Sequence, residues 1–234
     1  MSEEVVRGPW DLGRPGFSAR AEYQRLLDNE AARRRDVFGR YLGPVVDAVA
    51  GPSKEASAWA KGGKGEEAVG HYLTRVVGAH GVVLHDRAVP EGRANIDHIA
   101  IVPSGVWVID TKRYRGRVEQ RGGWFRSPPA LFVDGHNRTN LVTGALQQRQ
   151  MVQRFLGPKV PVQAALCFAD ADWGLFAKPL HLNDVMVTWP RRLGGSLLAG
   201  GGQLAARERD ELAQRLGVAF PAYVPGTSHS PTGA

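Results

Sequence analysis

Two apolar runs in the middle of the chain each contain an aspartate. Asp97 lies in the run 95–102, and Asp110 lies in the run 105–112, which ends with Lys112. An ionised carboxylate inside such a run is costly to bury unless it is paired, hydrogen-bonded or bound to a metal ion. Two such aspartates, with a lysine two residues after the second, are therefore candidates for a functional site.

The spacing between the two runs predicts how these side chains are arranged. The turn residues 103–105 between two apolar runs are typical of a β-hairpin. Asp110 and Lys112 are two residues apart, so they share one face of their strand. An even loop, such as Ser104-Gly105, places Asp97 opposite Lys112 on that face, whereas a loop of three places it on the other face. We expect the even register, because only that register assembles a site.

Two polar side chains on neighbouring helices are further candidates. Glu66 shares a helix face with Val69 and Leu73, which predicts that its carboxylate points toward the sheet. Gln148 is the polar member of an otherwise apolar helix stripe, and a buried glutamine needs hydrogen-bonding partners. A purely structural role for Gln148 is the alternative.

These residue types together favour one class of chemistry. Oxygen ligands from Asp97 and Asp110, with Glu66 in support, suit a hard cation such as Mg²⁺ or Mn²⁺. Such an ion lowers the pKa of a bound water and shields phosphate charge. Lys112 would then position the water or stabilise the pentavalent phosphate. The set is typical of phosphodiester hydrolysis.

The charge distribution indicates a polyanionic partner. The formal net charge is +7, and residues 87–126 contain eight Lys or Arg against four Asp or Glu, with aromatic residues between them. A basic segment with interleaved aromatics is typical of a nucleic-acid surface. The candidate contacts are Arg113, Arg115 and Arg117, together with Arg138 from a later loop. The alternative is that these arginines lie on solvated strand faces and in a surface loop.

Composition limits the other possibilities. A chain of 234 residues with 43% hydrophobic residues can form one domain with extensions. The single cysteine, Cys167, excludes an internal disulfide framework and a cysteine-based zinc cluster, and its apolar neighbours predict a buried position. The first 20 residues lack the apolar core of a signal peptide, and the apolar stretch 96–109 is interrupted and too short to span a bilayer. We therefore expect a soluble cytoplasmic protein with no membrane partner.

The periodicity of the remaining segments predicts a mixed α/β domain with a central sheet flanked by helices. Helices are expected at 19–50, at 66–77 after an opening glycine-rich segment, at 141–156 and at 203–216. Strands are expected at 82–85, 95–102, 105–112, 117–120, 124–126, 131–133, 160–168 and 185–189. The expected organisation is an N-terminal helical extension over 1–58, a domain over 59–220 and a disordered tail over 221–234.

Several segments resemble a known family. Gly62-x-x-Gly65-Glu66, Asn95–His98, the run 103–112 and Gln148 are similar to the motifs of the NERD (nuclease-related) domain family, in the form found in actinobacterial proteins. The resemblance covers roughly residues 60–190.

The resemblance implies a restriction-endonuclease-like core, because the family is thought to belong to the PD-(D/E)xK nuclease superfamily. In that case Asp97 matches the first aspartate, and Asp110-Thr111-Lys112 matches the (D/E)xK element. Glu66 matches the helix-borne acid, and Gln148 matches an accessory polar residue.

Two functions therefore remain open, with a third more distant. The first is metal-dependent phosphodiester hydrolysis of nucleic acid, with DNA as the expected substrate, and the intact Asp-Asp-x-Lys set favours it. The second is a catalytically inactive module on the same fold that binds nucleic acid or protein. The third is a structural protein assembled through the amphipathic helix 19–50.

Overall fold

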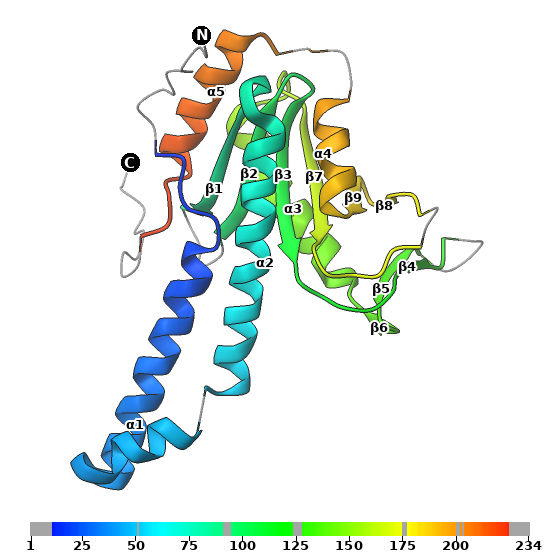
Figure 1. Ribbon diagram of the computed structural model, residues 1–234. Coiled ribbons are helices and arrows are strands. Elements are labelled where there is room, and N and C mark those ends of the chain that lie inside the picture. Colours follow the sequence, from blue (N-terminus) through cyan, green and yellow to red (C-terminus); the bar gives the residue numbers. More distant parts are fainter. Residues whose placement is uncertain are drawn as a thin grey trace.

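The computed structural model describes residues 11–50, 52–90, 95–123, 128–174, 177–199, 202 and 204–224, with the backbone alone for 34–50 and 59. Its centre is a six-stranded sheet in the order β1-β2-β3-β7-β9-β8 (Figure 1). The first three strands form an antiparallel meander, whereas β7 runs parallel to β3 and β9 runs parallel to β7. The strands are β1 (Val82–Ala88), β2 (Asn95–Val102), β3 (Gly105–Lys112), β7 (Val162–Phe168), β8 (Leu180–Leu182) and β9 (Val185–Thr188).

Helices cover both faces of this sheet, which confirms the expected fold class. On one face, α2 (Lys54–Val77) and α4 (Pro190–Leu198) enclose a core that includes Trp107 and Ile109 of β3. On the other face, α3 (Thr139–Leu156) and α5 (Ala206–Ala219) pack over Val106 and Val108. A strand buried on both faces needs a nearly continuous apolar run, which is what β3 has before Asp110.

Two further units project from this body (Figure 1). Helix α1 (Phe17–Ala50) packs against α2 to form a long hairpin, with the short 3-10 helix η1 (Gly78–His80) following α2. A small antiparallel sheet of β4 (Val118–Arg121), β5 (Ala130–Val133) and β6 (His136–Asn137) lies beyond the end of β3. Of the helices among the described residues, none combines the length and the apolarity needed to cross a membrane.

The β2–β3 hairpin has the even register that its chemistry requires. Val102 pairs with Gly105, so the loop is Pro103-Ser104 rather than Ser104-Gly105. This pairing, continued beyond His98 and Ile109, places Asp97 opposite Asp110 instead of Lys112. The expected parity is therefore confirmed, while the expected partner of Asp97 was wrong by two residues.

Helix α2 begins twelve residues earlier than expected. The glycine-rich segment 62–65 lies inside it, whereas the sequence suggested that this segment opens the helix. The helix starts after Ser53, whose Oγ accepts a hydrogen bond from the Ala56 N–H at 3.1 Å. The glycines allow close approach, because an added Cβ at Gly63 would lie 3.1 Å from Ala19 Cβ and one at Gly65 would lie 3.1 Å from Arg113 Cβ.

Other elements match the sequence expectations to within a few residues, with four additions. Strands β6 and β8, helix α4 and the 3-10 helix η1 were not anticipated. Cys167 is buried, as expected. The segment 124–126 lies outside the described residues, as does most of the expected tail. Within that tail, the Tyr223 N–H donates to the Asp86 carbonyl and Pro221 O accepts from the Ala88 N–H.

A buried arginine on β1 joins the two ends of the described chain. Arg87 is 1% exposed. Its Nε donates to Phe220 O at 2.6 Å, its Nη1 to Asp11 O at 2.9 Å and its Nη2 to Gly217 O at 3.0 Å. Burial lowers the pKa of this guanidinium to about 10, which leaves it charged at neutral pH. One side chain therefore holds both the N-terminal segment and α5 against the edge of the sheet.

We expect Arg87→Met to destabilise the protein by roughly 3 kcal/mol or more, because three carbonyls, one of them in a buried hydrogen bond, lose a charged donor. Urea unfolding followed by circular dichroism measures this change. Arg191→Met, at an exposed position on α4, is the matched control and should stay within about 0.5 kcal/mol of wild type. Equal stability of the two variants would contradict the anchoring role.

Candidate active site

Three of the expected site residues meet where β3 ends. The Lys112 Nζ donates to Asp110 Oδ1, and Asp110 is only 7% exposed. The Asp97 Oδ2 accepts a hydrogen bond from the Thr111 N–H at 2.7 Å. The hairpin thus holds both carboxylates and the ammonium at one end of the sheet.

Glu66 joins this group electrostatically from α2. Its side chain faces the sheet, as the helix periodicity predicts, and the residue is 8% exposed. Burial, followed by the negative charges of Asp86 and Asp110, raises the pKa of Glu66 to about 7 against an ordinary value of 4.5. The Gly16 N–H donates to Glu66 Oε1 at 3.0 Å and partly opposes this shift.

The group contains more acids than cations. Burial raises the pKa of Asp97 well above its ordinary value, and the neighbouring charges of Glu66 and Asp110 add to the effect. Burial opposes the charge on Lys112, but Asp110 and Asp97 outweigh it and raise the pKa of the ammonium. The raised pKa values of Glu66 and Asp97 favour their protonated forms, and a bound cation would favour the ionised forms instead.

The donor chemistry suits a hard cation, but the carboxylates do not form a ready-made cage. Among the described residues, no group of three or more His, Cys, Asp or Glu side chains is placed to hold a metal ion. Asp110 is engaged by Lys112, and Glu66 is engaged by the Gly16 N–H. A metal ion would therefore bind mainly between Asp97 and Asp110 and would draw Glu66 in only by exchanging its present partner.

Asp86 is a buried acid that the sequence analysis missed. It lies on β1 opposite Asp97, since its neighbours His85 and Arg87 pair with His98 and Ile96. Asp86 is 1% exposed and adopts a φ of 49°, a left-handed conformation that aspartate tolerates better than most residues. The expected strand 82–85 stopped short of it. The sequence signal that could have revealed Asp86 was a charged residue within a strand that continues to Ala88.

The Asp86 carboxylate connects α1 to the site. Its Oδ2 accepts the Ser18 N–H at the first turn of α1, so a core side chain caps this helix. Its Oδ1 accepts from Asn95 Nδ2 at 3.1 Å. Burial raises the pKa of Asp86, whereas these hydrogen bonds lower it. The start of the N-terminal extension is therefore bonded directly to the row of buried acids.

Gln148 lies close to this network without contacting the acids. Its Nε2 donates to the Asn95 carbonyl at 3.1 Å, which confirms the expectation of a hydrogen-bonding role. Its Oε1 is buried and lacks a hydrogen-bond partner within the described structure. Gln148 thus fixes the beginning of β2 and leaves one acceptor unused.

The four candidate arginines fall into two groups. The side chains of Arg115 and Arg117 are exposed. Arg113 pairs with Asp170 and also donates to the Lys61 carbonyl at 3.3 Å. Arg138 lies over the Tyr114 ring at 5.1 Å. Arg115 and Arg117 are therefore free to meet a phosphate, while the other two already serve the fold.

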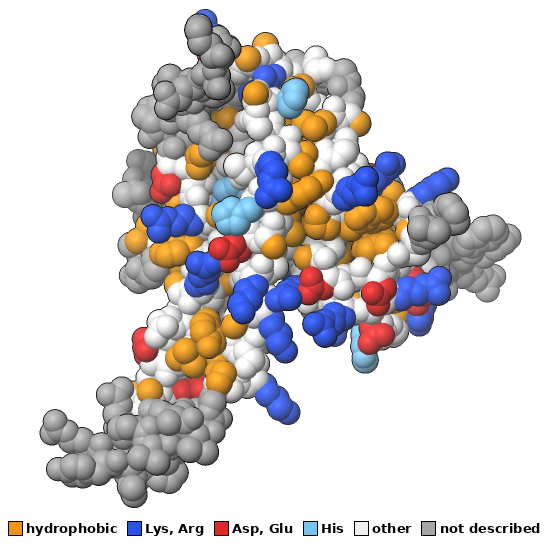
Figure 2. Space-filling view, in the orientation of Figure 1, with side chains coloured by type: hydrophobic (Ala, Val, Ile, Leu, Met, Phe, Trp, Pro, Cys, Tyr) orange, Lys and Arg blue, Asp and Glu red, His pale blue; other side chains and the backbone are white. Residues whose placement is uncertain are grey.

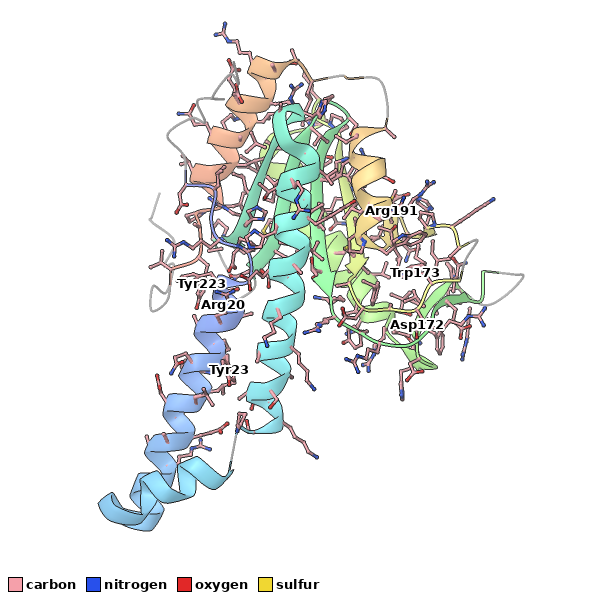
Figure 3. All side chains as sticks on the ribbon, in the orientation of Figure 1. Arg20, Tyr23, Asp172, Trp173, Arg191 and Tyr223 are labelled. Carbon is pink, nitrogen blue, oxygen red and sulfur yellow. The ribbon has the colours of Figure 1, made fainter. Side chains whose placement is uncertain are left out.

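The segment after β3 contacts Asp172, next to Trp173, in the segment after β7. Arg117 forms a parallel bridge with Asp172, and the Trp173 ring lies 4.8 Å from that of Trp189. Figure 3 shows Asp172 and Trp173 beside the small sheet.

One cavity of the described structure lies away from the hairpin acids. It has a volume of about 810 Å³ between the N-terminal segment, α2, β1 and α5, and residues lining it include Leu12, Arg14, His71, His85 and Arg209. None of the hairpin acids lines it. The cavity and the group of hairpin acids are therefore separate features of the structure.

The raised pKa of Glu66 predicts a pH-dependent stability. Its contribution is fully present below pH 4.5 and is lost as the pH rises through 7, because the folded state then holds a proton that the unfolded state releases. In EDTA, wild type should lose on the order of 3 kcal/mol more than Glu66→Gln between pH 4.5 and 7.5. Urea unfolding at several pH values tests this. Glu55→Gln, at an exposed position in the first turn of α2, is the control and should follow wild type, whereas parallel profiles of wild type and Glu66→Gln would refute the prediction.

The capping role of Asp86 predicts a local effect. Asp86→Ala should free the first turn of α1 and weaken folding by about 1–3 kcal/mol, because buried N–H groups lose their acceptor. Limited proteolysis should then cut within residues 11–33 sooner than in wild type. Asp210→Ala, at an exposed position on α5, is the control. Unchanged protection of that segment would show that Asp86 does not hold it.

Comparison with known proteins identifies the central part of the chain. A search of the curated proteins and a search of the solved structures found no match. Residues 61–169 match the family model of the nuclease-related domain, NERD. This span runs from within α2 to the residue after β7 and includes Glu66, both hairpin aspartates, Lys112 and Gln148. Residues 61–169 are thus similar to the nuclease-related domain family, as the motifs in the sequence indicated.

Proposed function

We propose that this protein hydrolyses phosphodiester bonds in nucleic acid with the help of a divalent metal ion. The observation that carries the proposal is the arrangement at the end of the hairpin. Asp97 and Asp110 lie opposite each other on neighbouring strands, and Lys112 shares their face and contacts Asp110. The nuclease-related domain that contains all three supports the same reaction class.

Each residue has a role that its surroundings support. Asp97 and Asp110 would hold Mg²⁺ or Mn²⁺, with Glu66 as a further oxygen donor. The ion would supply a water of lowered pKa and shield the phosphate. Lys112 remains protonated, so it orients the water or stabilises the charge that develops on phosphate oxygens. Gln148 acts through the backbone of β2 by fixing Asn95, and is a positioning residue.

The exposed arginines beyond β3 would bring the substrate to this group. Arg115 and Arg117 lie three and five residues after Lys112 in the chain, and their exposed side chains would contact phosphates near the reacting bond. We take DNA as the substrate, as expected from the sequence.

A non-catalytic module that binds nucleic acid or protein is the second candidate. The observation that favours it is that the carboxylates already have internal partners, namely Lys112 for Asp110 and the Gly16 N–H for Glu66. In a protein of this kind, the acids and the lysine would serve stability alone.

Cleavage assays separate the two candidates. Wild type should cleave labelled single-stranded or double-stranded DNA or RNA with Mg²⁺ or Mn²⁺ and lose activity in EDTA. Asp110→Ala and Lys112→Ala should each reduce the rate by about 100-fold or more, because each removes a group that acts on the reacting phosphate. Asp210→Ala and Lys159→Ala, at exposed positions outside the site, are the controls.

The outcomes lead to different conclusions. Equal cleavage by wild type and both site variants would refute the assignment. Nucleic-acid binding that survives both substitutions, without cleavage by any variant, would establish the binding module instead.

A further inference from the structure

Helix α2 is packed on three sides. Toward the sheet, Val69, Leu73 and Val77 enter the core. Toward α1, Glu67 forms an ion pair with Arg20, which Figure 3 shows on α1 together with Tyr23. These contacts, with a third set to α4, leave one side of α2 to solvent.

The third side of α2 meets α4. An added Cβ at Gly194 would lie 2.7 Å from Tyr72 Oη and 3.1 Å from Val76 Cγ1. The glycine therefore permits this close contact, and α2 cannot turn about its axis without losing it.

The fourth side is exposed and basic. Its members recur at spacings of three, four or seven residues, which places them on one face of a helix. We call this face the α2 basic stripe; it consists of Lys54, Ser57, Lys61, Lys64, Ala68, His71 and Arg75. All are exposed except Ser57, which is half-buried. Figure 2 shows basic side chains along the face of α2 that is turned to the viewer.

Four cations of the stripe have no carboxylate partner among the described residues. These are Lys54, Lys61, Lys64 and Arg75. His71 is different, because its Nε2 lies 3.7 Å from Glu67 Oε1. No member of the stripe is itself acidic. The stripe is therefore a row of positive charge in which the lysines and the arginine are not paired.

The dimensions of the stripe match a nucleic-acid duplex. From Lys54 to Arg75 the helix rises about 30 Å at 1.5 Å per residue. One turn of duplex DNA is about 34 Å long. The small residues Ser57 and Ala68 between the cations leave room for a sugar–phosphate backbone to approach the helix.

The stripe also leads to the candidate active site. Lys64 lies two residues before Glu66, and the Lys61 carbonyl accepts a hydrogen bond from Arg113, the residue after Lys112. Gly65 packs against the Arg113 side chain. A strand that follows the stripe would therefore pass the end of β3.

We propose that the α2 basic stripe binds the phosphate backbone of double-stranded nucleic acid and holds it beside the end of β3. The inference rests on the proposed function for the identity of the polyanion, and it adds the surface and the form of the substrate.

A duplex fits the stripe better than other polyanions. Single-strand binding surfaces combine positive charge with aromatic platforms on which bases stack, and the stripe contains no Phe, Tyr or Trp. A membrane-bound helix needs a free apolar face, and the apolar face of α2 is buried against the sheet. Point charges on lysines contact phosphates without reading sequence, so the binding is independent of sequence.

Fluorescence anisotropy in EDTA tests the proposal without cleavage. The probe is a labelled 20-base-pair DNA duplex, titrated with full-length wild type at several salt concentrations. The test variant combines Lys54→Gln, Lys61→Gln and Lys64→Gln. The matched control removes the same charge elsewhere by Arg154→Gln, Lys159→Gln and Arg207→Gln, all exposed positions. Circular dichroism confirms that both variants are folded.

We expect the stripe variant to bind about tenfold more weakly or worse, with a salt slope of log K against log salt that is smaller by about three. The control should bind nearly as wild type. A duplex of RNA in place of DNA shows whether the stripe distinguishes the two backbones, and similar loss with both supports backbone recognition.

Several results would overturn the proposal. These are unchanged binding by the stripe variant, an equal loss in the control variant, single-stranded DNA binding as tightly as the duplex, and polyglutamate competing as well as the duplex. The proposed hydrolysis and the proposed role of the stripe are refuted by different results. Duplex binding that depends on the stripe without any cleavage in Mg²⁺ refutes catalysis alone, and cleavage with unchanged binding by the stripe variant refutes the stripe alone.

Discussion

The repulsion among buried carboxylates is the constraint on which this structure depends. Asp86, Asp97 and Asp110 occupy matching positions on three neighbouring strands, and Glu66 adds a fourth negative group from α2. Packing of apolar side chains cannot compensate such charges, because desolvation penalises each ionised acid. The protein compensates them locally with one ammonium, several backbone N–H groups and an asparagine amide.

That compensation explains why α1 and the segment before it pack against the large sheet. The extension supplies the Gly16 N–H to Glu66 and the Ser18 N–H to Asp86. Arg87 also donates a hydrogen bond to the carbonyl of Asp11, which lies before α1 in the chain. The positive end of the α1 dipole therefore points at the acids, and it acts as part of their electrostatic surroundings. The backbone of residues 16 and 18 therefore supplies hydrogen bonds that the buried acids need.

The sequence allowed the local parts of the site to be predicted, because they depend on short-range periodicity. The two-residue period placed Asp110 and Lys112 on one face, and the helical period placed Glu66 toward the sheet. The role of Asp86 depends on partners 68 and nine residues away, Ser18 and Asn95, and no local pattern carries that information. For the hairpin register, the sequence predicted only that the loop has an even number of residues. It did not predict which two residues form the loop, because Pro103-Ser104 and Ser104-Gly105 are both acceptable two-residue turns.

The early start of α2 places inside the helix the glycines that suggested its beginning, and these glycines have a packing role there. Glycines 62, 63 and 65 lower helix propensity by about 1 kcal/mol each, so they indicated a helix boundary. The helix nevertheless includes them, and an added Cβ at Gly63 or Gly65 would lie only 3.1 Å from a side-chain carbon of Ala19 or Arg113, so both glycines allow close packing. The extra turns carry Lys54, Lys61 and Lys64 in line with His71 and Arg75. The close packing that the glycines permit is therefore also what makes a continuous basic face possible beside the acids.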